Sequence, residues 1–133
     1  MTRTTGFYLY GLPFASSEAA YMAGRTTDKE TQYTISSMDL NEGGYKVKKY
    51  SKSIRLEMDE RSRLKAMFSA LKAKFSLLDQ QELLLSFEPN FVEFNTWGDT
   101  FWGLCHDGTK WIGSNNLGKL LNHFHKILSS NGK

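Results

Sequence analysis

The chain has 133 residues and a mass of 15.2 kDa, a size typical of one domain, and we expect a single domain over residues 1–133. Its 40% hydrophobic and 23% charged residues are an ordinary soluble composition, and no apolar run approaches the ~18 residues of a transmembrane helix. The single cysteine excludes an internal disulfide and indicates a reducing, cytoplasmic setting. The net charge of +3 favours anionic partners and gives no indication of a membrane partner.

The N-terminal residues predict a short strand followed by a short helix. Residues 7–10 alternate as a strand does and are followed by glycine and proline. Ser16 or Ser17 can cap a helix over residues 18–23, which Gly24 would end. The bland interpretation of Glu18 in the first turn is a favourable interaction with the helix dipole.

The next segment predicts a loop, a strand and a basic window. Residues 26–32 are polar, residues 32–38 have the β-branched content of a strand, and residues 41–44 are a turn signal. The window that follows interleaves tyrosines with cations, which can bind phosphates and stack on bases. A solvated edge strand guarded by lysines is the alternative. The candidate nucleic-acid contacts are Lys46, Lys48, Lys49, Lys52 and Arg55.

The second half predicts three helices and a short strand. Residues 59–75 carry an apolar stripe at spacings of three and four, and Asp79 can cap a helix over residues 80–86. Residues 91–94 alternate as a strand that would partly enclose Glu93. In the final helix, residues 116–129, Gly118 indicates a close approach to the backbone by a neighbouring element or a ligand.

Residues 91–121 concentrate unusual side chains. They hold all three tryptophans and the only cysteine, and Asp99 lies between Trp97 and Trp102. An aromatic wall, a carboxylate and a helix N-terminus at Asn116 are typical of a pocket for a flat ring that carries phosphate. The histidines and the cysteine match no metal-ligand spacing, and the glycines match no Walker or dinucleotide motif, so we expect neither metal nor cofactor.

Three carboxylates could serve hydrolysis of a glycosidic bond. Glu18 begins a helix, Glu93 lies on the expected strand and Asp99 lies between the tryptophans. Such groups activate water, stabilise an oxocarbenium-like transition state or protonate the leaving group.

Four blocks of the chain, in order, resemble the YbiA-like, or NADAR, family. The D-x-x-W-G block followed by N-x-L-G-x-L-L is the more specific pair. The blocks are S-S-E-A-A-Y-M-A-G-R at residues 16–25, A-L-K-A-K-F at 70–75, F-V-E-F at 91–94 with G-D-T-F-W-G at 98–103, and S-N-N-L-G-K-L-L at 114–121.

The resemblance implies a compact, mainly helical α+β domain with a few short strands. It implies an N-glycosidase that removes ADP-ribose from modified bases, most directly guanine in DNA, and so reverses a toxin's modification. The partner would be ADP-ribosylated nucleic acid, with DNA favoured. The alternatives are cleavage of phosphoribosylated riboflavin intermediates and a non-catalytic module that binds ADP-ribose or a similar small molecule.

The matching positions imply the site. Glu18 and Asp99 would be the catalytic carboxylates and Glu93 an acid that orients the site. The implied substrate-binding residues are Ser17, Arg25, Lys74, Trp97, Trp102, Gly103, Asn115, Asn116 and Gly118. The chain departs from the family's E-H-x-x-Q-x-x-K at Ala19, Met22 and Arg25, which bears on the choice of substrate more than on the type of reaction.

Overall fold

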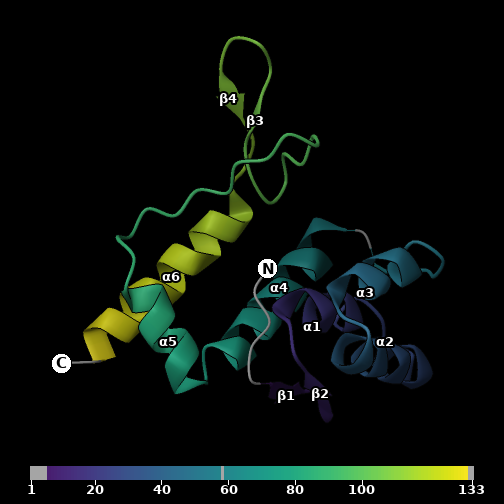
Figure 1. The fold of residues 1–133 in the computed structure, drawn as a ribbon. Coiled ribbons are helices and arrows are strands. Elements are labelled where there is room, and N and C mark those ends of the chain that lie inside the picture. Colours follow the sequence, from purple (N-terminus) through teal and green to yellow (C-terminus); the bar gives the residue numbers. More distant parts are fainter. Residues whose placement is uncertain (1–5, 58, 132–133) are drawn as a thin grey trace. The chain divides into compact units, whose positions relative to one another are not determined.

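The computed structural model describes residues 6–57 and 59–131. In this part of the chain, six helices and two antiparallel strand pairs follow the order β1, β2, α1 to α5, β3, β4, α6 (Figure 1). The fold is α+β and mainly helical, as predicted. The chain forms two compact units, residues 1–80 and 81–133. The expected single domain over residues 1–133 stays a prediction.

The first unit begins with a β-hairpin. Strands β1 (Phe7–Leu9) and β2 (Leu12–Phe14) are joined by a two-residue turn. Tyr10 and Gly11 both have positive φ, 56° and 75°, as a turn matched to strand twist requires. The first strand confirms the prediction, whereas the second strand was not predicted.

Helix α1 (Ser17–Ala23) confirms the predicted helix and begins one residue before its expected start. The Ser16 hydroxyl accepts a hydrogen bond from the Ala19 amide at 3.3 Å, and Gly24 ends the helix. Its small buried residues let it pack against α4 (Glu60–Lys74). At Gly24 a side chain would collide with the Tyr10 hydroxyl and would lie tightly against Ala66.

The strand predicted for residues 32–38 is wrong, because these residues lie in helix α2 (Lys29–Asn41). The Asp28 carboxylate caps this helix by accepting from the Thr31 amide at 3.2 Å, so the predicted loop ends at Asp28. The buried residues recur at the helical spacings of three and four. They are Gln32, Ile35, Ser36 and Asp39. Burial of this face outweighs the strand preference of its threonines, tyrosine and isoleucine.

Helix α3 (Gly44–Ser51) occupies the basic window, so the alternative of an edge strand is wrong. Gly43, at φ 91°, supports the predicted turn before it. Val47 alone is buried on this helix, which leaves its lysines in solvent. Helix α4 then confirms the prediction, with Asp59 as its cap. Helix α5 (Leu78–Leu85) begins before Asp79, which therefore lies inside the first turn.

The second unit contains hairpin β3 (Cys105–His106) and β4 (Trp111–Ile112), and helix α6 (Asn116–Asn131). The final helix confirms the prediction. The strand predicted for residues 91–94 is wrong, since only Phe94 pairs, in an isolated bridge to Leu104. The predicted alternation is nevertheless present, with Glu93 half-buried and Phe94 exposed.

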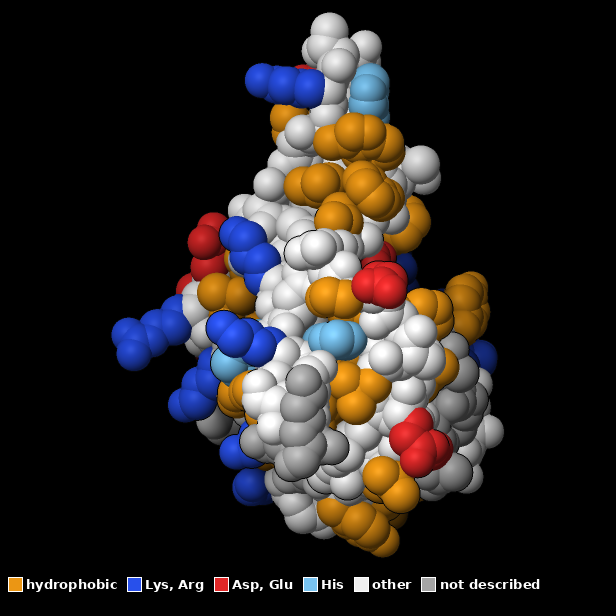
Figure 2. Space-filling model, turned by 90° about the vertical axis from the view of Figure 1, so that its left-hand side faces the viewer, with side chains coloured by type: hydrophobic (Ala, Val, Ile, Leu, Met, Phe, Trp, Pro, Cys, Tyr) orange, Lys and Arg blue, Asp and Glu red, His pale blue; other side chains and the backbone are white. Residues whose placement is uncertain are grey.

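Exposed hydrophobic side chains gather on the β3–β4 hairpin, as Figure 2 shows. Phe94 and Trp111 contact edge to face, with ring centroids 4.8 Å apart. Among the described residues, no helix is long and apolar enough to cross a bilayer.

Candidate functional site

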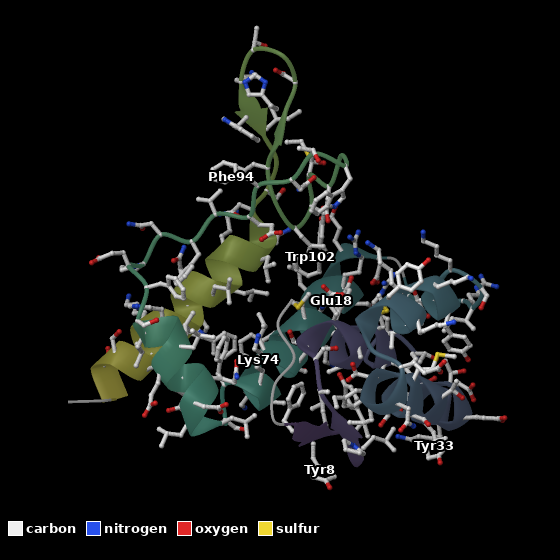
Figure 3. All side chains as sticks on the ribbon, in the orientation of Figure 1. Tyr8, Glu18, Tyr33, Lys74, Phe94 and Trp102 are labelled. Atoms are coloured by element: carbon white, nitrogen blue, oxygen red, sulfur yellow. The ribbon has the colours of Figure 1, made fainter. Side chains whose placement is uncertain are left out.

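Glu18 is presented by the first turn of α1 (Figure 3). It is half-buried, and its carboxylate makes no hydrogen bond or ion pair within the described residues. A half-buried carboxylate usually has a partner, so an unused one is available to a ligand or to water. The catalytic role of Glu18 stays a prediction.

Ser17, one of the implied substrate-binding residues, has a buried side chain. It is 1% exposed and faces the interior beside the helix cap. A hydroxyl at that depth contacts protein atoms and cannot reach a bulky ligand without movement of α1. We therefore assign Ser17 a packing role.

Asp39 holds the segment that leads into α1, and sequence reasoning missed it. This fully buried carboxylate accepts hydrogen bonds from the amides of Ala15, at 2.6 Å, and Ser16, at 3.1 Å. It also accepts one from the Ser16 hydroxyl, at 2.9 Å. Three donors stabilise the buried charge in place of a cation. The placement of Glu18 therefore depends on a side chain of α2.

Arg25 lies just after α1 and is tied to the segment before α4. Its Nε donates to the Glu57 carbonyl at 2.8 Å, and the Glu57 amide donates to the Arg25 carbonyl at 2.8 Å. The guanidinium carbon lies 5.2 Å from the centre of the Tyr21 ring. Arg25 also lines a cavity of about 610 Å³, so it remains a candidate for binding an anion.

Lys74 ends helix α4 and is half-buried (Figure 3). Its ammonium nitrogen lies 5.7 Å from the centre of the Phe75 ring and makes no ion pair within the described residues. Burial lowers the pKa of Lys74. A cation held in this way costs stability, which favours a functional reason for keeping it.

Replacement of Lys74 by methionine is expected to raise stability while lowering activity. Lys74 binds its proton more tightly in the unfolded chain than in the folded protein. At a pH below the folded pKa of Lys74, its charge therefore destabilises the fold. This cost is relieved as pH rises through that pKa towards the unfolded value of ~10.4. Lys74→Met should therefore melt higher at pH 7, by an amount that shrinks towards pH 10 in thermal scans. Loss of a charged phosphate contact should reduce turnover about tenfold or more.

Lys72→Met is the matched control, because Lys72 lies on the same helix and is exposed. It should change neither melting nor turnover. A lower melting temperature for Lys74→Met would contradict the unpaired state of the lysine.

The predicted nucleic-acid contacts lie on and just after α3. Each of these cations is exposed, and none has a hydrogen bond or ion pair within the described residues. They are Lys46, Lys48, Lys49, Lys52 and Arg55. They form a solvated cationic surface, which an anionic polymer can reach without rearrangement.

Asp99 organises the loop that precedes Trp102 in the second unit. Its Oδ1 accepts hydrogen bonds from the amides of Phe101, at 3.0 Å, and Trp102, at 2.9 Å. Asn95 grips the backbone of Asp99 from the other side, with contacts of 2.8 and 3.0 Å. Oδ2 makes no hydrogen bond within the described residues. One oxygen is thus structural and the other is available to a substrate.

Asn115 fastens the start of α6 to the residues around Glu93. Its Oδ1 accepts from the Glu93 amide at 2.9 Å, and its Nδ2 donates to the Phe91 carbonyl at 3.1 Å. Asn115 itself has positive φ, 51°. Each end of its amide is engaged by the chain, which makes Asn115 a structural clamp, and its implied role in binding substrate stays a prediction.

The N-terminus of α6 is also engaged by the chain. The amides of Asn116 and Leu117 donate to the carbonyls of Phe101 and Trp102, at 3.3 and 3.0 Å. These two amides are engaged by the chain, and a role for Asn116 in binding substrate stays a prediction. A side chain at Gly118 would collide with the Phe91 carbonyl and with Asn115. The close approach predicted for Gly118 is therefore made by a neighbouring segment and not by a ligand.

The aromatic wall is partly present. Trp102 is half-buried, and its ring contacts Phe101 edge to face with centroids 4.7 Å apart. Trp97 is 71% exposed, so it lies on the surface and does not form a wall of an enclosed pocket. Gly103 is buried, and a side chain there would collide with the Glu93 carbonyl, so this position requires glycine. The Glu93 carboxylate itself has no hydrogen bond within the described residues.

Within each unit the structure brings part of the predicted site together. Helix α1 carries Glu18, and α4, on which it packs, carries Lys74. In the second unit one hydrogen-bonded loop holds Glu93, Asp99 and Trp102. Across the described ranges, no three histidine, cysteine, aspartate or glutamate residues gather as metal ligands would.

Comparison with known proteins finds a protein of similar fold but no matching sequence family. No protein-family model matches the chain, and no curated protein matches it. The solved structure of the Escherichia coli protein YbiA is similar, with a TM-score of 0.71 and 26% sequence identity. The similarity covers 96% of this chain and 74% of YbiA. The chain therefore has a YbiA-like α+β fold.

Proposed function

We propose that the protein is an N-glycosidase that removes ADP-ribose from a modified base, with guanine in DNA as the leading substrate. The observation that carries the proposal is the YbiA-like fold over 96% of the chain. The sequence blocks that resemble the YbiA-like family lie within this span. The activity itself comes from that resemblance.

The chemistry assigned to each group follows from its contacts. Glu18 and Oδ2 of Asp99 make no hydrogen bond within the described residues, so each can orient water or stabilise positive charge at the anomeric carbon. Lys74 supplies a half-buried positive charge for a phosphate. Trp102 offers a partly exposed aromatic surface for the base.

The cationic surface of α3 favours a nucleic-acid substrate over a free metabolite. Several exposed lysines on one short helix attract a phosphate backbone, and each contact releases counterions. A small phosphoribosyl compound needs only one or two such contacts. This difference separates the leading substrate from riboflavin intermediates.

The test is release of free ADP-ribose from ADP-ribosylated DNA, measured beside release of ribose phosphate from phosphoribosylated riboflavin intermediates. We expect turnover of the DNA to fall steeply with salt, and turnover of a free ADP-ribosylated nucleoside to fall less. Lys48→Gln with Lys49→Gln should reduce the salt dependence for DNA by about one unit of slope for each lost contact. Equal salt dependence for both substrates would contradict DNA as the substrate.

A non-catalytic module that binds ADP-ribose is the remaining candidate. Asp99→Asn separates it from an enzyme, because the amide keeps Oδ1 as an acceptor for Phe101 and Trp102 but loses the charge. The loop should keep its structure. An enzyme should then lose turnover while retaining ligand, whereas a binding module shows no turnover in either form.

A further inference from the structure

Asn95 is a buried amide side chain of the second unit, only 5% exposed. Its Nδ2 donates to the Asp99 carbonyl at 2.8 Å, and its Oδ1 accepts from the Asp99 amide at 3.0 Å. One side chain thus satisfies both backbone polar groups of a single residue, as a paired strand does in an antiparallel sheet. These two bonds fix the backbone of Asp99, and with it the direction in which the Asp99 side chain leaves the chain.

The Asn95 amide is itself held in one orientation. The Cys105 thiol donates to its Oδ1 at 2.9 Å, and the Asn95 backbone amide donates to the Leu104 carbonyl at 3.1 Å. A Cβ added at Gly103 would lie 3.0 Å from Asn95 Nδ2, so glycine at this position leaves room for the amide. The flipped amide would turn its NH₂ group towards two donors and its oxygen towards a carbonyl. Asn95 is therefore a fixed support for its neighbour.

Asp99 is held at both its backbone and its side chain. Asn95 binds the backbone, while the amides of Phe101 and Trp102 bind Oδ1. With both parts fixed, Oδ2 points in one direction, and it makes no hydrogen bond within the described residues. A catalytic group needs this precision, because a displacement of about 1 Å can lower a reaction rate by ~10²-fold.

We propose that Asn95 is a positioning residue, which orients Oδ2 of Asp99 towards the reacting bond. The proposal rests on the proposed function, since it requires Asp99 to act in the reaction. Asn95 acts through Asp99, because its own amide is buried and hydrogen-bonded within the chain. Its loss should therefore lower kcat and leave KM nearly unchanged.

The experiment measures kcat and KM for release of ADP-ribose from ADP-ribosylated DNA in Asn95→Ala, Asp99→Asn and the double variant. Asn95→Ala should lower kcat by about 10- to 100-fold, with KM within about twofold. The double variant should be no slower than Asp99→Asn alone, because Asn95 acts only through the Asp99 carboxylate. Multiplied losses in the double variant would overturn the proposal.

Asn122→Ala is the matched control. The Oδ1 of Asn122 accepts from the backbone amides of Asn90, at 2.7 Å, and Phe91, at 2.8 Å, so this asparagine also fastens backbone in the second unit. Asn122→Ala should lower the melting temperature, as Asn95→Ala does, but should keep kcat. Equal losses of kcat in the two variants would indicate a general loosening of the fold and would contradict a positioning role.

Cys105 provides a milder variant that is unlikely to unfold the protein, since its thiol is a weak donor. Cys105→Ala removes one of the two donors to the Asn95 oxygen and should lower kcat by about two- to fivefold. Cys105→Ser keeps a donor and should restore most of the rate. Full activity in Cys105→Ala would count against the thiol as part of the support.

Amide hydrogen exchange tests the placement of Asp99 without any activity. In Asn95→Ala the amides of Phe101 and Trp102, which donate to Asp99 Oδ1, should exchange about tenfold faster or more, whereas Asn122→Ala should leave their protection unchanged. Unchanged protection in Asn95→Ala would overturn the proposal whatever the activity. If the unaltered protein released no ADP-ribose, the proposed function and the catalytic part of this proposal would fall, whereas faster exchange would still show that Asn95 places Asp99.

Discussion

Glu18→Gln is expected to reduce release of ADP-ribose by a factor of about 10²–10⁴, the usual effect of removing a general acid or base. Stability should fall by no more than about 1 kcal/mol, because the carboxylate makes no hydrogen bond or ion pair within the described residues and only its interaction with the helix dipole is lost. The measurement is single-turnover release from ADP-ribosylated DNA, beside thermal melting of both proteins. A large loss of activity with only a small change in melting temperature is the signature of a chemical role.

Glu60→Gln is the matched control, because Glu60 also lies in the first turn of a helix and is exposed. It should retain full activity. Full activity in Glu18→Gln would remove Glu18 from the catalytic site, and equal losses in both variants would indicate a general effect of charge.

Asp39→Ala is expected to cost about 3–5 kcal/mol of folding free energy. It removes the acceptor for two buried amides and one hydroxyl, and each unsatisfied buried group costs ~1–3 kcal/mol. Melting should fall by roughly 10 °C or more in thermal scans followed by circular dichroism. The melting temperature of Asp39→Asn should lie between those of the unaltered protein and Asp39→Ala. Its remaining oxygen still accepts a hydrogen bond, whereas its amide nitrogen replaces an acceptor and faces a donor.

Glu30→Ala on the same helix provides the comparison for Asp39. Glu30 is exposed, so its removal should change melting by no more than a few degrees. If Asp39→Ala lowered the melting temperature by only as much as Glu30→Ala, Asp39 would not be the acceptor that holds the start of α1.

The parts of the fold that could be predicted are those with local signals. Helix α1 has a serine before it and a glycine after it, and α4 has a cap and an apolar stripe. Both were predicted because caps and periodicity act within one or two turns. Helix α2 was missed because its buried face is mainly polar, so the hydrophobic period is weak. This polar face of α2 is buried only because α1, α3 and β2 pack against the helix.

The site could be predicted in part for the same reason. The functional interest of Glu18 and Asp99 follows from residue type and position. The role of Asp39 depends on donors 23 and 24 residues away, which no local pattern reveals. Asn115 was predicted to bind substrate, and its hydrogen bonds to Phe91 and Glu93 show a structural role that the sequence did not suggest.

The β3–β4 hairpin has a consequence for how such a protein can change over evolution. Gly103 and Gly113 lie in contact at its base, since a side chain at Gly113 would meet the Gly103 carbonyl. At its tip Asp107 accepts from Thr109 and Lys110, so the tip is held by its own residues. Insertions or deletions there can lengthen or shorten the hairpin without displacing Asp99. The hairpin can therefore vary in length and aromatic content between lineages while the loop that carries Asp99 stays unchanged.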